Sequence, residues 1–470
     1  CVFSNNNANT EGAGVILYRG GVLNHCTIAN NECTGTDITI GGVRYGRTGG
    51  LFIYGAGSAF NSVVWGNTCS ANDNIQYGYY ATTDIYPKAT AQRPRLSYMA
   101  FSNFDITDWG NALRSNVFQL SKENFNSEKA GNYPMFTQPS ATAGVSGATE
   151  SPLAWLPDPK SYLQQKGVQV SQLNTFGNII TKSHSAKDFV RNVFNPVSAL
   201  GAFAVTDELY KVAELPAVDG SGSTIPTLFV DPNRVVKDKD VTTSGSSWDT
   251  PLNNVSEAVK DMEEYIKQHP NTSKTQILVK QGNITTAGSS SYLYDTTTGE
   301  ANLESGAIHL LSNMLMYGGY SSSLTGTTVT DTKDASGKTI VARNPKENVT
   351  RINGNIIGNY KYNSVHCVIF PNVQNAVLDG FYISYGNAEK PDDPNYNNDA
   401  PADSSYSYRL AYGYGAGIFI GARSRSDRTD MTGNEVRNCV ISNCWAPMGG
   451  AAVFVSGDNY LNDNSTLQKA

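Results

Sequence analysis

Residues 1–31, CVFSNNNANTEGAGVILYRGGVLNHCTIANN, contain the same short phrase twice. CVFSNN at residues 1–6 returns as CTIANN at residues 26–31, and a glycine-flanked apolar run separates the two copies. Within these runs apolar side chains alternate with small or polar ones, which is the period of a strand with one buried face. A phrase that returns at a period between about 20 and 50 residues is typical of a solenoid.

Further copies of both elements occur near the two ends of the chain. Residues 49–54 (GGLFIY), 415–421 (GAGIFIG) and 449–455 repeat the glycine-flanked run, and residues 438–443 (NCVISN) repeat the opening phrase. Glycine can supply the positive φ of a tight corner, and asparagine amides can stack between successive coils. The sequence therefore predicts an all-β fold, a right-handed parallel β-helix.

Composition narrows the class of protein. The chain has 470 residues, 16% of them charged, with 44 glycines and 26 tyrosines, a profile of many short strands and turns rather than disorder. The net charge is −6 and no basic face is evident in the sequence, which argues against a nucleic-acid partner. No apolar run reaches the length of a membrane span, and any export signal is expected upstream of residue 1.

The repeat fades and then resumes, which predicts two partial β-helix units. Residues 1–205 are interpreted as the C-terminal part of one unit with its closing cap, and residues 206–226, broken by proline and glycine, as a linker. Residues 227–470 are interpreted as the N-terminal part of a second unit. The chain would thus open and close in mid-solenoid.

A capping helix is expected near residues 251–267, at the start of the second unit. Asp249 or Thr250 would be its N-cap, with Pro251 at the first helical position. Its apolar face would consist of Leu252, Val255, Val259, Met262 and Ile266.

Placing the end of the chain before its beginning aligns two phrases. The order 467–470 followed by Cys1 then resembles residues 23–26 and 436–439. We therefore expect either that the chain is a window on a longer protein of tandem units or that chains associate end to end. Unpaired strands at such ends are adhesive unless they are covered.

Seven cysteines are present, without the spacing of a zinc site. Cys1, Cys26 and Cys439 occupy the same position of the repeated phrase. We expect them to form a column of inward-facing thiols that act as small apolar side chains, in preference to disulfides. The cysteines therefore do not indicate whether the protein works in an oxidising or a reducing compartment.

These phrases resemble the right-handed parallel β-helix repeats of large bacterial surface proteins. The resemblance rests on CxIxNN-type phrases alternating with GGxxF-type runs, on residues 228–232 (LFVDP) and 245–248 (GSSW), and on residues 377–381 (VLDGF) and 200–203 (LGAF). It is to the pectin-lyase-like fold and to polymorphic outer-membrane-protein-like repeats. The resemblance implies that fold and a surface or adhesin-like role, and it implies no particular activity.

Candidate polar sites all have a plain structural alternative. An acidic cluster could hold Ca²⁺ for a polysaccharide lyase, or be a solvated loop, and it comprises Asp392, Asp393, Asp399 and Asp403. A second patch is a basic site or a set of surface ion pairs, and it comprises Arg423, Arg425, Asp427, Arg428 and Asp430. Asp379 could be one carboxylate of a hydrolase, or a turn residue that caps local backbone.

Tyrosines form two groups that could stack on sugars or line an ordinary exposed strand. They are Tyr77, Tyr79 and Tyr80, and Tyr406, Tyr408, Tyr412 and Tyr414. His25 and His366 each precede a cysteine, and a packing role is expected for both. No catalytic, cofactor-binding or metal-binding residue is assigned.

The sequence favours a non-enzymatic, extracellular or cell-surface bacterial protein, adhesin-like or a structural rod. Its expected partners are a glycan or protein ligand and further copies of itself, with no cofactor. The alternatives are a polysaccharide lyase or glycoside hydrolase on the same fold, and a non-catalytic glycan-binding module.

Overall fold

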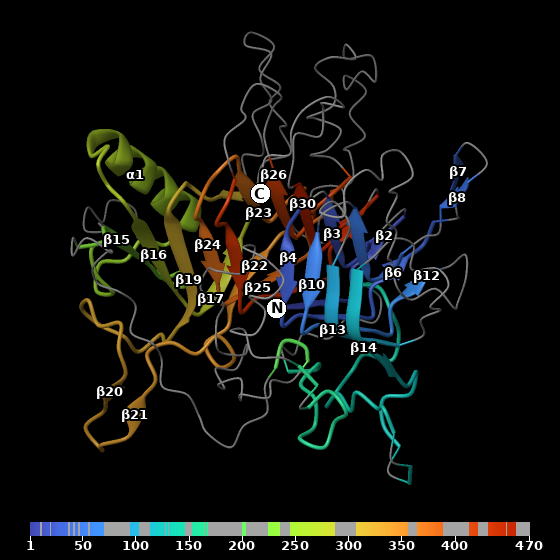
Figure 1. The fold of residues 1–470 in the computed structure, drawn as a ribbon. Helices are drawn as coiled ribbons and strands as arrows, with labels where there is room; N and C mark the ends of the chain where they lie inside the picture. The colour runs from blue at the N-terminus through green and yellow to red at the C-terminus, as the bar shows by residue number, and fades with distance from the viewer. Residues whose placement is uncertain are drawn as a thin grey trace.

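The computed structural model describes most of the chain (Figure 1). The described residues are 1–9, 12–18, 20–35, 38–40, 43–45, 48–54, 57–69, 95–102, 113–126, 128–129, 131–145, 153–164, 166–167, 200–203, 224–235, 245–286, 307–355, 364–388, 413–421, 431–447 and 449–456. Within them the chain forms short strands and one helix, so the all-β class is confirmed.

Four parallel sheets contain nearly all of the described strands. In spatial order, sheet I runs β17 (Gly282–Thr285), β22 (Thr350–Asn353), β25 (Phe381–Ser384), β28 (Val440–Ser442), β1 (Val2–Ser4), β5 (Thr27–Ala29), β11 (Val63–Trp65), β13 (Arg95–Ser102), β10 (Ser58–Phe60) and β4 (Val22–Asn24), with β14 (Leu113–Leu120) also paired to β13. Sheet II runs β15 (Thr227–Val230), β16 (Thr275–Lys280), β19 (Met314–Tyr320), β24 (Val377–Asp379) and β27 (Glu435–Arg437).

The other two parallel sheets are shorter. Sheet III runs β18 (Ile308–His309), β23 (Val368–Pro371), β26 (Ile418–Gly421), β30 (Val453–Ser456), β3 (Val15–Tyr18) and β9 (Leu51–Tyr54). Sheet IV runs β12 (Thr68–Cys69), β6 (Glu32–Cys33), β2 (Asn7–Ala8) and β29 (Trp445–Ala446). Two antiparallel hairpins project from the sheets, β7 (Ile38–Ile40) with β8 (Val43–Tyr45), and β20 (Thr332–Lys333) with β21 (Thr339–Ile340).

The chain visits the sheets in turn. It passes from β27 in sheet II to β28 in sheet I, β29 in sheet IV and β30 in sheet III. At the other end of the sequence β1, β2 and β3 follow the same order through sheets I, IV and III. The glycine-flanked runs therefore become neighbours in sheet III, where Phe419, Phe454, Ile16 and Phe52 align in register.

The N-terminal strands pair directly with the C-terminal strands. Val2 lies in register with Val440 on one side and with Thr27 on the other. β2 pairs with β29 and β3 with β30 in the same way. In space, the described strands of residues 1–120 thus follow those of residues 227–456. Residues 467–470, which the sequence aligned in front of Cys1, lie outside the described residues.

Asparagine pairs after the strands have two distinct roles. The first asparagine turns the corner, because Asn5 and Asn30 have φ values of 56° and 50°; Asn443, which Cys444 follows, turns the equivalent corner with a φ of 58°. The second points inward, and Asn31 donates its side-chain amide to Asn67 at 2.8 Å and accepts one from Asn6 at 2.8 Å. Asparagine tolerates the left-handed region better than most residues, and each buried hydrogen bond contributes about 1 kcal/mol.

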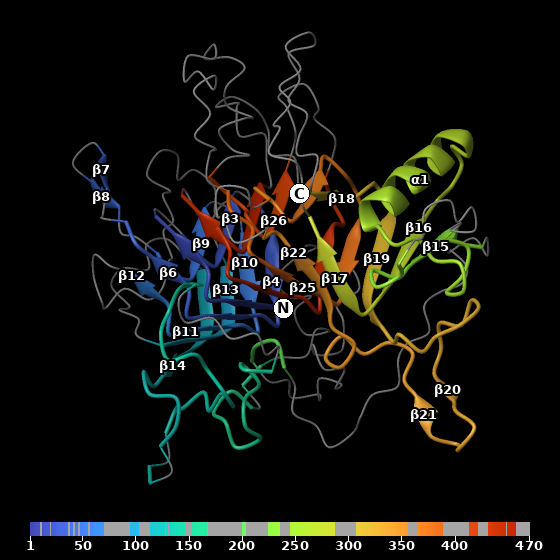
Figure 2. The same ribbon diagram turned by 180° about the vertical axis from the view of Figure 1, so that it is seen from behind.

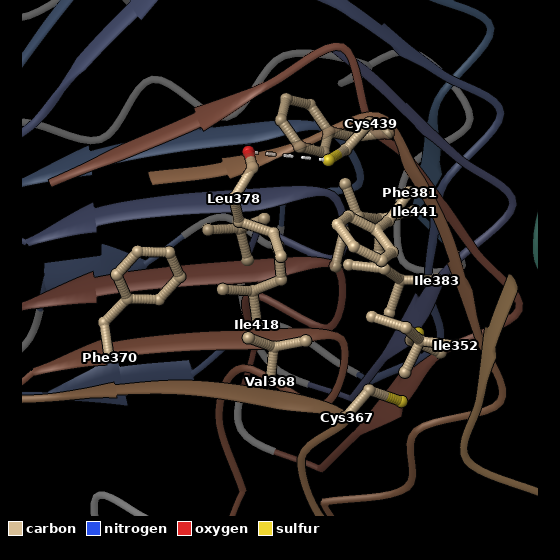
Figure 3. Close-up of a cluster of buried hydrophobic side chains, with 14 of the residues drawn as sticks. Ile352, Cys367, Val368, Phe370, Leu378, Phe381, Ile383, Ile418, Cys439 and Ile441 are labelled. Carbon is tan, nitrogen blue, oxygen red and sulfur yellow. Dashed lines mark hydrogen bonds between the residues drawn. The ribbon is translucent and has the colours of Figure 1, made fainter. Parts of the chain in front are cut away.

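The interior between the sheets is apolar. Figure 3 shows Leu378, Phe381, Cys439 and Ile441 packed together, with the Cys439 thiol 3.9 Å from the carbonyl oxygen of Leu378. Cys26 and Cys439 are buried as predicted, whereas Cys1 is half-buried. Burial raises the pKa of Cys439 and of Cys444 to about 12.

The predicted capping helix is present, although it starts later than expected. α1 spans Val255–Gln268, and its N-cap is Asn254, whose side chain accepts from the amides of Ser256 and Glu257. The expected caps at Asp249 or Thr250 are wrong, because Leu252 pairs with Val230 and its segment is extended. The apolar face of the helix packs into the interior beside β15, β16 and β18.

Figures 1 and 2 place α1 at one end of the row of strands and β14 near the other. Described residues of 121–164 and 200–203, among them Phe136, Trp155 and Phe203, pack on the face of sheet I that carries Val63 and Trp65. Trp65 of β11 makes edge contacts with Phe136 and Trp155 at 5.6 and 6.2 Å between ring centroids. Of the expected linker 206–226, only residues 224–226 lie in the described part.

Candidate functional site

A cluster of charged side chains lies on sheet II. In it, buried or half-buried acidic and basic side chains form ion pairs with one another. Asp379 at the end of β24 is in register with Tyr317 of β19 and Arg437 of β27. Glu435 and Arg343 complete this group, which we call the Asp379 cluster. Parallel pairing positions the first three side chains, because in-register residues share one face of the sheet.

Arg343 reaches the cluster from the segment that follows β21. Its Nε donates to the carbonyl oxygen of Gly318 at 2.7 Å, and its Nη2 donates to the Asp379 carboxylate at 2.6 Å and to the Asp379 carbonyl at 3.0 Å. The guanidinium lies 5.1 Å from the centre of the Tyr317 ring. Gly380 has a φ of 83°, and a Cβ there would collide with Arg343. Glycine at position 380 therefore makes the close approach possible.

Asp379 is 5% exposed and accepts a further hydrogen bond from the Asn438 side chain at 2.9 Å. Burial by itself would raise the pKa of Asp379, but the charges of Arg343 and Arg437 and the hydrogen bonds hold it below its ordinary value. Arg343 stays protonated, because the loss of solvation is outweighed by Asp379. Burial also raises the pKa of Tyr317, so the phenol stays neutral.

This electrostatic balance limits the chemistry of the cluster. A general acid needs a carboxyl group whose pKa is raised toward neutrality, and a glycosidase needs two carboxyl groups facing a sugar. Here Asp379 is held ionised, and Asp379 and Glu435 both approach the same Arg437 Nε, at 3.6 and 3.3 Å. The cluster joins segments of the fold, and its geometry does not favour proton transfer to a substrate.

The sequence singled out Asp379 but not its partners. The Asp379 carboxylate accepts hydrogen bonds from the side chains of Arg343 and Asn438, which belong to two other segments of the chain. The carboxylate thus links these segments. Arg343 carries no sequence signal, since it lies in an excursion between strands. The alignment of residues 377–379 with 435–437 could have placed Arg437 beside Asp379.

Two predicted histidines can be located. His25 is buried at a corner with a φ of 49°, between β4 and β5. His366 is buried, lies 2.9 Å from the carbonyl oxygen of Gly415 through Nδ1, and stacks on Phe419 at 5.2 Å. Both occupy packed positions, which agrees with the packing role expected for them.

Most of the other predicted polar sites lie outside the described residues. These are the acidic cluster Asp392, Asp393, Asp399 and Asp403, the patch Arg423, Arg425, Asp427, Arg428 and Asp430, and the tyrosines Tyr77, Tyr79, Tyr80, Tyr406, Tyr408 and Tyr412. Tyr414 is described, and it is half-buried against Phe454 with 4.7 Å between ring centres. It extends an outward aromatic column in which Phe419 stacks on Phe454 at 5.6 Å.

Within the described ranges, no three His, Cys, Asp or Glu side chains gather as metal ligands would. The single helix in that part of the chain, α1, is too short and too polar to cross a membrane.

Comparisons of the chain with protein-family models, with curated protein sequences and with solved structures give no match.

Proposed function

We propose that the chain is a right-handed parallel β-helix that serves as a non-enzymatic surface protein, either a structural rod or an adhesin-like presenter of loops. The observation that carries the proposal is the in-register return of the chain through sheets I to IV. Residues 439, 1 and 26 follow one another along sheet I, with backbone bonds of 2.9 Å from Val2 to Cys439 and from Thr27 to Cys1. Such stacking builds a rigid body in which each coil contacts only its neighbours.

The use of polar side chains supports a structural role. The inward asparagines Asn6, Asn31 and Asn67 bond one another, and Asp379 is neutralised by arginines. In an enzyme of this fold we would expect polar side chains to converge on a groove with a carboxyl group or a base open to substrate. In the described residues the best charged group is instead closed on itself. The resemblance to bacterial surface repeats favours export and a location outside the cell.

A glycan array combined with a lyase absorbance assay on the same glycans tests the proposal. The rod or adhesin function predicts binding without turnover, or no glycan binding. Release of unsaturated or reducing products would overturn it in favour of a lyase or a glycoside hydrolase. Asp379→Asn should be run beside the wild type, because only an enzyme that uses this carboxylate would lose turnover while the fold persists.

Binding to glycans without turnover leaves a choice between an adhesin and a glycan-binding module. Surface labelling of intact producing cells separates these outcomes, since an adhesin-like rod must be accessible from outside. Sedimentation velocity over a range of concentrations then tests the expected end-to-end association. A monomer at all concentrations would remove self-association from the proposal.

A further inference from the structure

Two cysteines of sheet IV lie directly side by side. Cys69 of β12 and Cys33 of β6 are in register, and Ala8 of β2 and Ala446 of β29 continue the same column. Residues in register on parallel strands turn their side chains to the same face of the sheet. Here that face is the interior, because Cys33 is 0% and Cys69 is 2% exposed. The two thiols are therefore buried neighbours on adjacent strands.

The spacing of these strands suits a covalent link between the two side chains. Neighbouring strands lie about 4.8 Å apart, and the Cα atoms of a disulfide lie about 4.4–6.8 Å apart. The Cβ atoms of a disulfide are closer, at about 3.5–4.5 Å, so β12 would have to approach β6 by about 0.5 Å. β12 can make this movement, because among the described strands it is the last of sheet IV and pairs with β6 alone.

Other buried cysteines are placed differently. Cys26 and Cys439 come just before strands β5 and β28, and their thiols donate to the carbonyl oxygens of Asn24 at 3.4 Å and Arg437 at 3.1 Å. The thiol of Cys444 donates in the same way to a carbonyl oxygen of its own segment, at 3.5 Å. These thiols are turned toward backbone, whereas Cys33 and Cys69 are matched with each other inside two neighbouring strands.

We propose that Cys33 and Cys69 form a disulfide that fastens β12 to β6 when the chain folds under oxidising conditions. The thiolate of one cysteine attacks a small-molecule disulfide, such as oxidised glutathione, and releases one glutathione thiolate. The thiolate of the other cysteine then attacks the protein sulfur of this mixed disulfide and releases the second glutathione thiolate. The two glutathione thiolates take up the two protons that the cysteines have lost. Two protein thiols are thereby oxidised, and one glutathione disulfide is reduced to two thiols.

The burial of both thiols determines when this bond forms. A small-molecule oxidant reaches them in the unfolded or partly folded chain, before β12 and β6 close over the interior. The bond then restricts the unfolded chain and holds the two-residue strand β12 at the end of its sheet. Disulfides persist in proteins outside the cell, so the bond is compatible with the proposed surface role but does not depend on it.

Refolding of the full chain tests the proposal. Reduced, denatured protein is refolded in buffers with several ratios of reduced to oxidised glutathione, the remaining thiols are alkylated, and the chain is digested without reduction for mass spectrometry. We expect a linked pair of peptides that contain Cys33 and Cys69, lighter by two hydrogen atoms than the separate thiol peptides. Recovery of both cysteines in alkylated form at the most oxidising ratio would overturn the proposal. Linkage of either one to a different cysteine would overturn it as well.

Cys33→Ala is the matched variant, because alanine already occupies the same column at Ala8 and Ala446. The variant should fold, lose the linked peptides and leave Cys69 alkylated. Reduction should lower the Tm of the oxidised wild type by at least ~2 °C and leave the Tm of Cys33→Ala unchanged. Equal changes in the two proteins would overturn the stabilising role of the bond. If Cys33→Ala does not fold, the peptide map of the wild type still decides whether the bond forms.

Discussion

Arg343 and Asp379 form an ion pair with 2.6 Å between Nη2 and Oδ1, although they are 36 residues apart in sequence. The pair ties the excursion that carries β20 and β21 to the outward face of sheet II. Gly318 accepts from the same guanidinium, so a single side chain bonds two neighbouring strands of that sheet. A buried pair of this kind adds little net stability, because the cost of desolvating two charges offsets much of their attraction.

Removing one partner of this pair should be costly. Asp379→Ala leaves the Arg343 guanidinium buried without its counter-ion, and we expect a loss of about 3–5 kcal/mol in the free energy of unfolding. Urea denaturation followed by circular dichroism measures it. Replacing both residues, Arg343→Met with Asp379→Leu, should recover most of the loss. Asp261→Ala, an exposed site on α1, is the control.

The same carboxylate should make stability depend on pH. The pKa of Asp379 is lower in the folded chain than its ordinary value, so the unfolded state binds the proton more readily. Its stabilisation is present in full above the ordinary carboxyl pKa of about 3.9 and is lost as the pH falls below it. The stability difference between the wild type and Asp379→Asn should therefore shrink in acid. A difference that grows in acid would contradict this sign.

A corner asparagine should tolerate glycine but not alanine. Asn443 has a φ of 58°, a conformation that glycine adopts freely and that costs alanine about 1–2 kcal/mol. The amide of Asn443 donates to the carbonyl of Asn5, and this backbone bond survives either change. Thermal unfolding should rank wild type and Asn443→Gly together, above Asn443→Ala. The reverse order for glycine and alanine would exclude a backbone cause.

An inward asparagine should tolerate neither alanine nor glycine. Asn31→Ala removes the amide that joins Asn6 and Asn67 and leaves buried polar groups unsatisfied, at about 1–3 kcal/mol each. We expect glycine at position 31 to destabilise as well, since the cause is the lost side chain. Denaturant unfolding of the two variants distinguishes the ladder position from the corner position.

Thiol chemistry should separate the cysteines by position. Burial raises the pKa of Cys439 and Cys444 to about 12, so almost no thiolate forms there near pH 8. Alkylation of the native chain followed by peptide mass spectrometry should modify the half-buried Cys1 first. All three should react in denaturant. Modification of native Cys439 as fast as Cys1 would show that the interior is open.

The repeated phrases allowed much of the local structure to be predicted. The alternation in CVFSNN and CTIANN predicted strands, and their common period predicted that Cys1, Cys26 and Cys439 would lie in one column. The helix near residues 251–267 followed from its apolar face, but its first turn did not. Pairing of Leu252 with Val230 is a tertiary contact, and it moved the cap to Asn254.

The Asp379 cluster could be predicted only in part. Asp379 and Arg437 belong to repeated phrases, so a common register was open to sequence reasoning. Arg343 was not, because the excursion that carries it has no period and its direction depends on where it packs.

The sequence by itself determined which residues alternate into strands and which thiols share a column, because these properties are local and return with the repeat. Only the tertiary structure decided that Val2 pairs with Val440 in the same chain and that Arg343 neutralises Asp379. A repeat specifies the kind of neighbour that each strand accepts, but many strands meet that description. The choice among them is made by packing across the whole chain.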